Sequence, residues 1–99
     1  PRQPRVTIAS DTGRLLERGD KVWFEGNVVM VREADQRYEA SRLSTDRLLV
    51  LPDTGIARTT GPVLLENPAA RIEASGLEMN NQARTLRLDR VQATYKPRR

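Results

Sequence analysis

The sequence predicts an all-β fold of the sandwich, jelly-roll or barrel type. Short segments alternate apolar and polar residues with a period of two, as half-buried strands do. Turn-forming residues separate these segments at short intervals. The chain has 99 residues, of which 37% are hydrophobic and 4% aromatic, so one thin core of Leu, Val, Ile and Ala must serve all of residues 1–99. A thin core is typical of a flattened or elongated sheet structure.

Several apolar segments are expected to form strands: Val6-Thr7-Ile8, Val22-Trp23-Phe24, Val28 to Val31, Leu48 to Leu51, Val63-Leu64-Leu65 and Leu86-Arg87-Leu88. Turns are expected where Gly, Pro, Asp and Asn gather, at residues 11–13, 18–20, 33–36, 52–55, 60–62 and 80–81. Gly26 interrupts the pattern between two strong strand segments. A glycine at such a place indicates a bulge or the close approach of another backbone.

The segment from Asn67 to Gly76 has the signature of a short helix, with Asn67 as the N-cap, Pro68 at the first helical position and Gly at the end. An internal repeat favours a strand there instead. Ala9-Ser10, Ala40-Ser41 and Ala74-Ser75 would each close an apolar strand, beginning at Ile8, Tyr38 and Ile72. A longer strand would follow each, over Val22 to Val31, Leu48 to Leu51 and Leu86 to Tyr95. Such units bury their apolar faces only by stacking edge to edge, so the last one should present a free edge.

Composition excludes several functions. The chain has no His and no Cys, so the usual general bases, thiol nucleophiles and transition-metal ligands are missing. We therefore expect neither an enzyme nor a cofactor. Asp11, Glu17 and Asp20 lie in turns, where a solvated loop is the expected role rather than a calcium site. Ser10 and Ser41 have no activating base nearby in sequence, and small residues commonly end strands.

The formal net charge of +4 raises the question of nucleic-acid binding. Basic residues alternate with Asp and Glu along the chain, and only at the two ends are the charged residues all basic. Single-strand binding also needs aromatic stacking platforms, which are scarce here. We therefore keep a basic nucleic-acid-binding barrel as the weakest alternative and expect no nucleic-acid partner.

Two apolar strand faces are the features of the sequence that bear on its function. Val22, Phe24, Val28 and Met30 share one face of their strand, and Leu86 and Leu88 share one face of theirs. Taken alone, these patterns favour the packed core of an ordinary sandwich. A β-repeat scaffold for protein–protein contacts, with a fully packed interior, is thus the main alternative to a ligand-binding fold.

Three stretches together resemble the periplasmic domain of the LptC family, which belongs to the lipopolysaccharide-transport bridge. They are Val22-Trp23-Phe24-Glu25-Gly26-Asn27-Val28, then Gly76-Leu77-Glu78-Met79, and Leu86 through Tyr95 to Pro97; the segment Leu43 to Leu48, Thr59-Thr60 and Val63 adds to the match. The resemblance covers most of the chain. Members of this family usually carry an N-terminal transmembrane helix and further strands before the part matched here.

The resemblance implies an open, twisted antiparallel β-jelly roll, truncated at its N-terminus, and a non-enzymatic role. Lipopolysaccharide acyl chains would lie in a trough between two sheets, against Val22, Phe24, Val28, Met30, Leu48, Val50, Leu86 and Leu88. Gly26 would bend its strand around the trough, and Gly76 would do the same or simply turn the chain. The resemblance also reverses the preference for a packed core, because the same residues then serve as core and as lipid contact.

The family further implies two protein partners. A neighbouring LptA-like jelly-roll protein would add head to tail at the last strand, along Ala93, Thr94 and Tyr95, and an ABC-transporter complex would dock from the inner membrane. Alone, two copies of this chain are expected to pair through the same edge. The implied location is the periplasm, with an inner-membrane anchor in a segment absent from this sequence.

Overall fold

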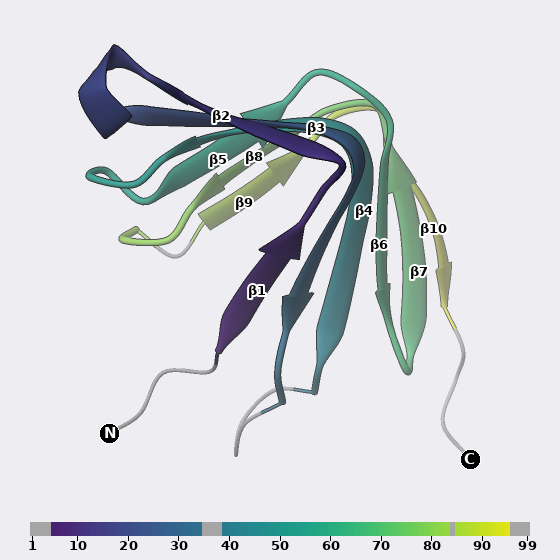
Figure 1. Ribbon diagram of the computed structural model, residues 1–99. Coiled ribbons are helices and arrows are strands. Elements are labelled where there is room, and N and C mark those ends of the chain that lie inside the picture. Colours follow the sequence, from purple (N-terminus) through teal and green to yellow (C-terminus); the bar gives the residue numbers. More distant parts are fainter. Residues whose placement is uncertain (1–4, 35–38, 84, 96–99) are drawn as a thin grey trace.

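The computed structural model describes residues 5–34, 39–83 and 85–95, which form one strongly curled, open antiparallel sheet (Figure 1). Its strands are β1 (Val6–Ala9), β2 (Thr12–Leu16), β3 (Lys21–Arg32), β4 (Ser41–Leu51), β5 (Ile56–Thr59), β6 (Val63–Asn67), β7 (Ala70–Ala74), β8 (Leu77–Asn80), β9 (Thr85–Leu88) and β10 (Gln92–Tyr95). A turn of 3-10 helix, η1 (Glu17–Gly19), joins β2 to β3. The all-β class and the open jelly-roll form are confirmed, and every predicted apolar segment lies in a strand.

The sheet has two arms that share the long central strands β3 and β4. These pair along almost their whole length, from Val22 opposite Val50 to Arg32 opposite Ser41. The β1 arm has the strand order β1, β3, β4, β6, β7 and β10, and the β2 arm has the order β2, β3, β4, β5, β8 and β9. In Figure 1 the β1 arm runs downward from the bend and the β2 arm extends to the left. The chain therefore crosses the bend repeatedly, at the joints β1–β2, β5–β6, β7–β8 and β9–β10 and within β3 and β4.

A β-bulge divides β3 between the two arms. The register between β3 and β4 shifts between Glu25 and Val28, and the two residues in between, Gly26 and Asn27, have φ of 86° and 49°. Glycine reaches this region without a steric penalty, and Asn is among the few other residues that tolerate it. Asn27 Nδ2 also donates a hydrogen bond to Asp11 Oδ2 at 2.9 Å. A bulge bends its strand and increases the local twist, so this one directs the chain from one arm into the other.

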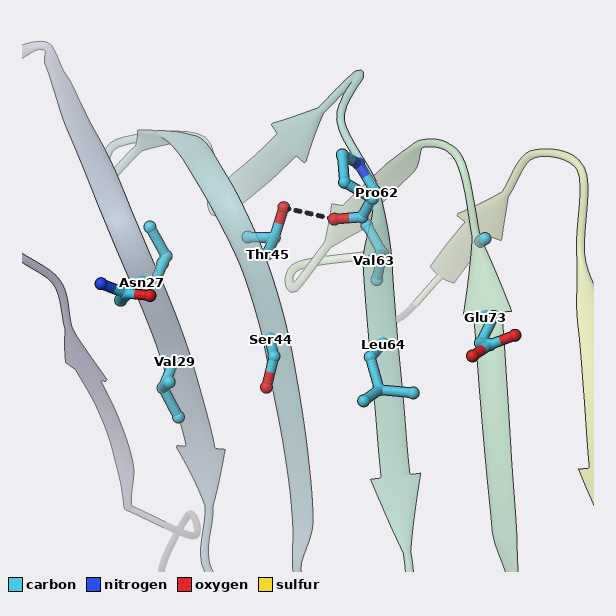
Figure 2. A pocket seen from close by; sticks show the side chains of 10 residues that line it. Asn27, Val29, Ser44, Thr45, Pro62, Val63, Leu64 and Glu73 are labelled. Atoms are coloured by element: carbon cyan, nitrogen blue, oxygen red, sulfur yellow. Dashed lines mark hydrogen bonds between the residues drawn. The ribbon is translucent and has the colours of Figure 1, made fainter.

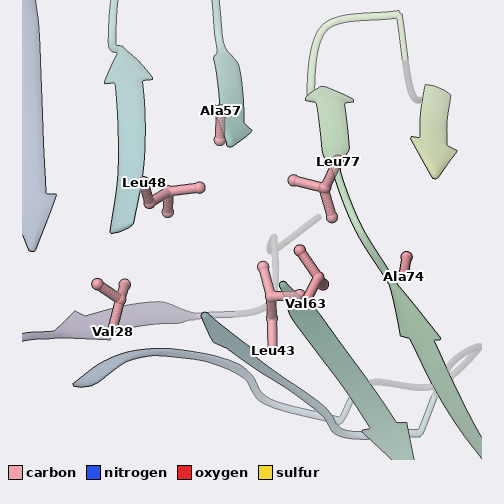
Figure 3. Packing of buried hydrophobic residues seen from close by; sticks show 7 residues of the cluster. All are labelled: Val28, Leu43, Leu48, Ala57, Val63, Ala74 and Leu77. Atoms are coloured by element: carbon pink, nitrogen blue, oxygen red, sulfur yellow. The ribbon is translucent and has the colours of Figure 1, made fainter. Parts of the chain in front are cut away.

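The core lies along the inside of the bend. Its buried apolar residues are Val28, Leu43, Leu48, Ala57, Val63, Ala74 and Leu77. Figure 3 shows side chains of β4, β5 and β8 pointing toward those of β3 and β6 across the angle between the arms. Thr45 is buried among them, and its hydroxyl donates to the carbonyl oxygen of Pro62 at 2.8 Å, at the β5–β6 joint.

The strand predicted in place of a helix after Asn67 is confirmed as β7. Asn67 Oδ1 accepts hydrogen bonds from the backbone N–H groups of Ala69 and Ala70, both at 2.8 Å. This is the bonding that a helix N-cap makes, but here it closes a tight hairpin between β6 and β7. The predicted turns at 18–20, 52–55, 60–62 and 80–81 are found, whereas the turn expected at 11–13 lies at Ser10 and Asp11. The turn expected at 33–36 lies partly outside the described residues.

The prediction of one continuous strand from Leu86 to Tyr95 is wrong. β9 ends at Leu88, the chain bends at Asp89 and Arg90, and β10 begins at Gln92. β9 pairs with β8 on one arm and β10 pairs with β7 on the other. The pattern misled because both strands are short and no Gly or Pro marks the bend, where Arg90 itself takes a positive φ of 52°.

The Ala-Ser repeat is correct only in part. Ala9 and Ala74 end β1 and β7, but Ser41 begins β4 instead of closing a strand. Tyr38, where that strand was expected to start, lies outside the described residues. What repeats in the structure is instead the crossing of the bend: after one or two strands the chain passes from one arm to the other.

Candidate functional site

The inner face of the curled sheet is apolar in the rows next to the bend, and at the far end of the β1 arm it also carries Arg32 and Ser41, in the row of Val6. Cross-strand partners point to the same face, so the register assigns whole rows of residues to it. On the β2 arm one row runs through Leu15, Val22, Val50, Ala57, Met79 and Leu86. On the β1 arm a row runs through Ile8, Met30, Leu43, Leu65, Ile72 and Ala93. Both rows contain core residues, and they extend past the core to the first and last strands of each arm.

All the residues predicted for the trough lie on this inner face, but they divide into two groups. Val28 and Leu48 are 1% and 0% exposed, so they are core residues with no surface left for a ligand. The rest keep some exposure, and Phe24, Met30, Val50 and Leu88 pack against the core from its margin. Leu86 is 48% exposed. The part of the inner face that a ligand can touch therefore starts where the core ends.

Large apolar side chains are also exposed at both ends of the inner face. Val6 and Leu15, on the first strand of each arm, are 50% and 72% exposed. Leu86 and Tyr95, on the last strand of each arm, are 48% and 73% exposed. By strand alternation all four share the face of the buried residues next to them. Within residues 5–34, 39–83 and 85–95, apolar side chains of the inner face are thus exposed at both edges of the sheet.

Sequence reasoning missed part of this face, namely Val6, Ile8, Leu15, Leu65 and Met79. Val6 and Ile8 belong to a predicted strand, and Leu77-Glu78-Met79 alternates in the same way. That alternation was the signal for them, but the face of each strand could not be assigned without the register. Leu15 carries no such signal, because its neighbour Leu16 is equally apolar and the register with β3 alone decides which of the two faces inward.

The residues predicted for the partner edge lie on β10. Ala93, Thr94 and Tyr95 pair with Ile72, Arg71 and Ala70 of β7, and the described part of the chain places no strand on the other side. All three are exposed. Ala93 and Tyr95 face inward and Thr94 faces outward. Strand β9 is likewise paired on one side only in the described residues, as are β1 and β2 at the opposite end of the sheet.

The outer face of the β1 arm has an open hollow of about 500 Å³ near the bend. Figure 2 shows Val29, Ser44 and Leu64 side by side on β3, β4 and β6, with Glu73 beyond them on β7. Of the residues predicted for the trough, only Val28 lines it. This hollow mixes apolar and polar side chains and lies on the opposite face from the apolar rows.

Nothing in the described residues gathers the side chains of a metal centre: they contain no group of three or more acidic residues placed to hold an ion. Glu17, one of the acidic turn residues, instead pairs with Lys21 at 3.0 Å. The described part of the chain also contains no helix of the length and hydropathy needed to cross a membrane.

The sequence also matches the model of a protein family, and this match is consistent with the curled open sheet. The model of the family described as lipopolysaccharide-assembly, LptC-related, matches residues 1–96, and so spans both arms. The chain belongs to the LptC family. Proteins of the LptC family act in lipopolysaccharide transport, in the periplasmic part of the envelope bridge, and are not known as enzymes. A search of curated proteins gave no match.

Proposed function

We propose that this LptC-family domain holds lipopolysaccharide acyl chains on its inner face and passes them to a neighbouring bridge protein joined to it by strand addition. The observation that carries the proposal is the run of exposed apolar side chains from the margin of the core to both edges of the sheet. Exposed Leu and Tyr at these positions contribute little to the stability of the domain itself. An acyl chain that covers them gains about 0.8 kcal/mol for each buried CH₂ group.

The proposed lipid contacts are the predicted trough residues that keep exposure, Val22, Phe24, Met30, Val50, Leu86 and Leu88, extended at the edges by Val6, Leu15 and Tyr95. Val28 and Leu48 support this surface from beneath. Because apolar contact is not directional, no polar motif is needed for such binding. A ligand of this kind can also slide along the face, as transport requires.

Strand addition is proposed at the two ends of the sheet. A free edge offers a row of unpaired backbone N–H and C=O groups, and another strand can complete the ladder. The last strands, β9 and β10, would join the first strands of the next jelly-roll protein. This head-to-tail contact would bring two inner faces into line. The inner-membrane transporter complex and the membrane anchor that the resemblance implies belong to the same proposal.

A matched pair of variants on β9 tests the lipid-binding face. Leu86 and Thr85 are neighbours, both exposed, and lie on opposite faces of the same strand. Leu86→Arg should weaken capture of a fluorescent fatty-acyl probe about tenfold or more, because a charge would have to leave water. Thr85→Arg should leave it unchanged. Lipopolysaccharide should displace the probe from the parent protein.

Equal probe binding by the two folded variants would show that the inner face does not hold acyl chains. In that case the protein-interaction scaffold becomes the better explanation. Circular dichroism of both variants establishes that they fold, and their exposed positions make this the expected result.

A further inference from the structure

The outer face of the β2 arm carries a feature that lipid binding on the inner face does not use. The register aligns Arg14, Trp23, Leu49, Arg58, Glu78 and Arg87 in one row across its six strands. This row alternates with the inner row that contains Val22 and Val50. Its two apolar members, Trp23 and Leu49, lie side by side with arginines on both flanks.

These two side chains form the floor of a hollow of about 230 Å³, whose rim includes Arg47, Arg58, Glu78 and Arg87. Trp23 Nε1 donates a hydrogen bond to Glu25 Oε1 at 3.0 Å, which fixes one edge of the indole ring. Trp23 and Leu49 are each half-buried although they point away from the core. A fixed, half-buried Trp beside Leu and Arg has the composition of an interface centre.

The charges on the rim are unequally satisfied. Arg87 lies 3.7 Å from Glu78 and 3.8 Å from Asp89, and Arg47 lies 3.5 Å from Asp46. Within the described residues, Arg58 forms no ion pair. Its guanidinium therefore stands next to the apolar floor with its donors free. A carboxylate is the group that a guanidinium binds best, by two parallel hydrogen bonds.

We propose that this hollow binds an acidic, extended segment of a protein partner. One apolar side chain of the segment would cover Trp23 and Leu49, and a neighbouring carboxylate would pair with Arg58. The hollow has room for one or two side chains, and its rim of charged groups does not suit a lipid tail. The contact lies on the opposite face from the proposed lipid surface, so the two can be occupied together.

The chain has a single Trp, so its fluorescence reports on this hollow alone. The probe is a capped pentapeptide of sequence Gly-Glu-Leu-Glu-Gly, with Lys in place of both Glu residues as the control peptide. We expect the acidic peptide to change the emission of Trp23 in a saturable way and the basic peptide to leave it unchanged. No saturable change with millimolar acidic peptide overturns the proposal.

Two arginine variants with the same change of charge locate the contact. Arg42 is exposed on the outer face of the β1 arm and, in the described residues, forms no ion pair either. Arg58→Gln should weaken peptide binding about tenfold and Arg42→Gln less than about twofold, because only Arg58 loses a charge-assisted hydrogen bond to the peptide. Equal losses in the two variants would mean general attraction to a basic protein and overturn the proposal.

Inorganic phosphate separates a specific peptide site from a general anion site. Phosphate at the concentration of the peptide should not displace it, because phosphate makes no contact with the apolar floor. Displacement at that concentration contradicts a partner segment. Capture of the acyl probe should be the same with and without bound peptide, so the test does not depend on the lipid-binding proposal.

Discussion

The carboxylate of Asp11 lies directly over Gly26: a Cβ atom at Gly26 would stand 2.7 Å from Asp11 Oδ2. The backbone N–H of Asp11 donates to the carbonyl oxygen of Gly26 at 2.8 Å, so the β1–β2 joint touches β3 at the bend. The same arrangement recurs along the bend. A Cβ at Gly61 would stand 2.5 Å from Asp46 Oδ1, and one at Gly76 2.9 Å from Asp89 Oδ2.

The first prediction concerns this contact. Gly26→Ala should lower the free energy of unfolding by about 3 kcal/mol, because it adds a clash with Asp11 to the strain of a positive φ. Gly19 is the matched control, with a φ of 91° and no atom within 4 Å of an added Cβ. Gly19→Ala should cost about 1 to 2 kcal/mol, from strain alone. Urea unfolding of both variants measures the difference. Equal losses of unfolding free energy would mean that the Asp11 side chain moves aside at no measurable cost.

The second prediction concerns the buried hydroxyl of Thr45. Thr45→Val keeps the shape of the side chain but leaves the carbonyl oxygen of Pro62 without its partner, at a cost of about 1 to 3 kcal/mol. Thr45→Ser keeps the hydrogen bond and loses only a methyl group, at a cost of about 1 kcal/mol. Thermal unfolding should therefore rank the parent above the Ser variant and the Ser variant above the Val variant. The reverse order of the two variants would show that packing at this position outweighs the hydrogen bond.

The third prediction separates core from ligand surface on the inner face. Leu48→Ala removes a side chain that is fully buried and should cost about 2 to 5 kcal/mol. Leu15→Ala removes one that is 72% exposed and should change stability by less than about 0.5 kcal/mol. Under the lipid-binding proposal, Leu15→Ala should nevertheless weaken capture of the acyl probe. A Leu15→Ala variant that binds the probe as the parent does would remove β2 from the proposed surface.

The fourth prediction concerns strand addition at β10. In an antiparallel pair successive N–H groups point alternately to the partner strand and away from it, so of Ala93 and Thr94 one donor faces β7 and the other faces the free edge. Pro at the free-edge position should abolish pull-down of a neighbouring jelly-roll bridge protein while leaving thermal stability unchanged. Pro at the other position should loosen β10 itself.

Hydrogen exchange of β3 serves as the control for both proline variants, since this central strand should stay protected. Undiminished pull-down by the folded Ala93→Pro, Thr94→Pro double variant would show that the bridge does not run through this edge.

The Ala-Ser repeat favoured the strand after Asn67, and alternation predicted the apolar segments that lie in strands and the shared face of Val22, Phe24, Val28 and Met30. Alternation could not separate Val28 from Leu86, because burial depends on the distance of a residue from the bend and not on its own type. It also could not show the bend at Asp89 and Arg90, where neither Gly nor Pro interrupts the pattern. The row that joins Trp23 to Arg58 likewise exists only through pairing between distant segments.

The position of the core along the bend means that the stiffness of the domain is graded. Every fully buried apolar side chain lies close to a point where the chain crosses the bend, and exposure rises toward the ends of the arms. Small changes in the angle between the arms therefore disturb few packed atoms near their ends. The packed atoms are thus concentrated along the bend, and under the lipid-binding proposal the arms would accommodate acyl chains that differ in number and length without repacking the core.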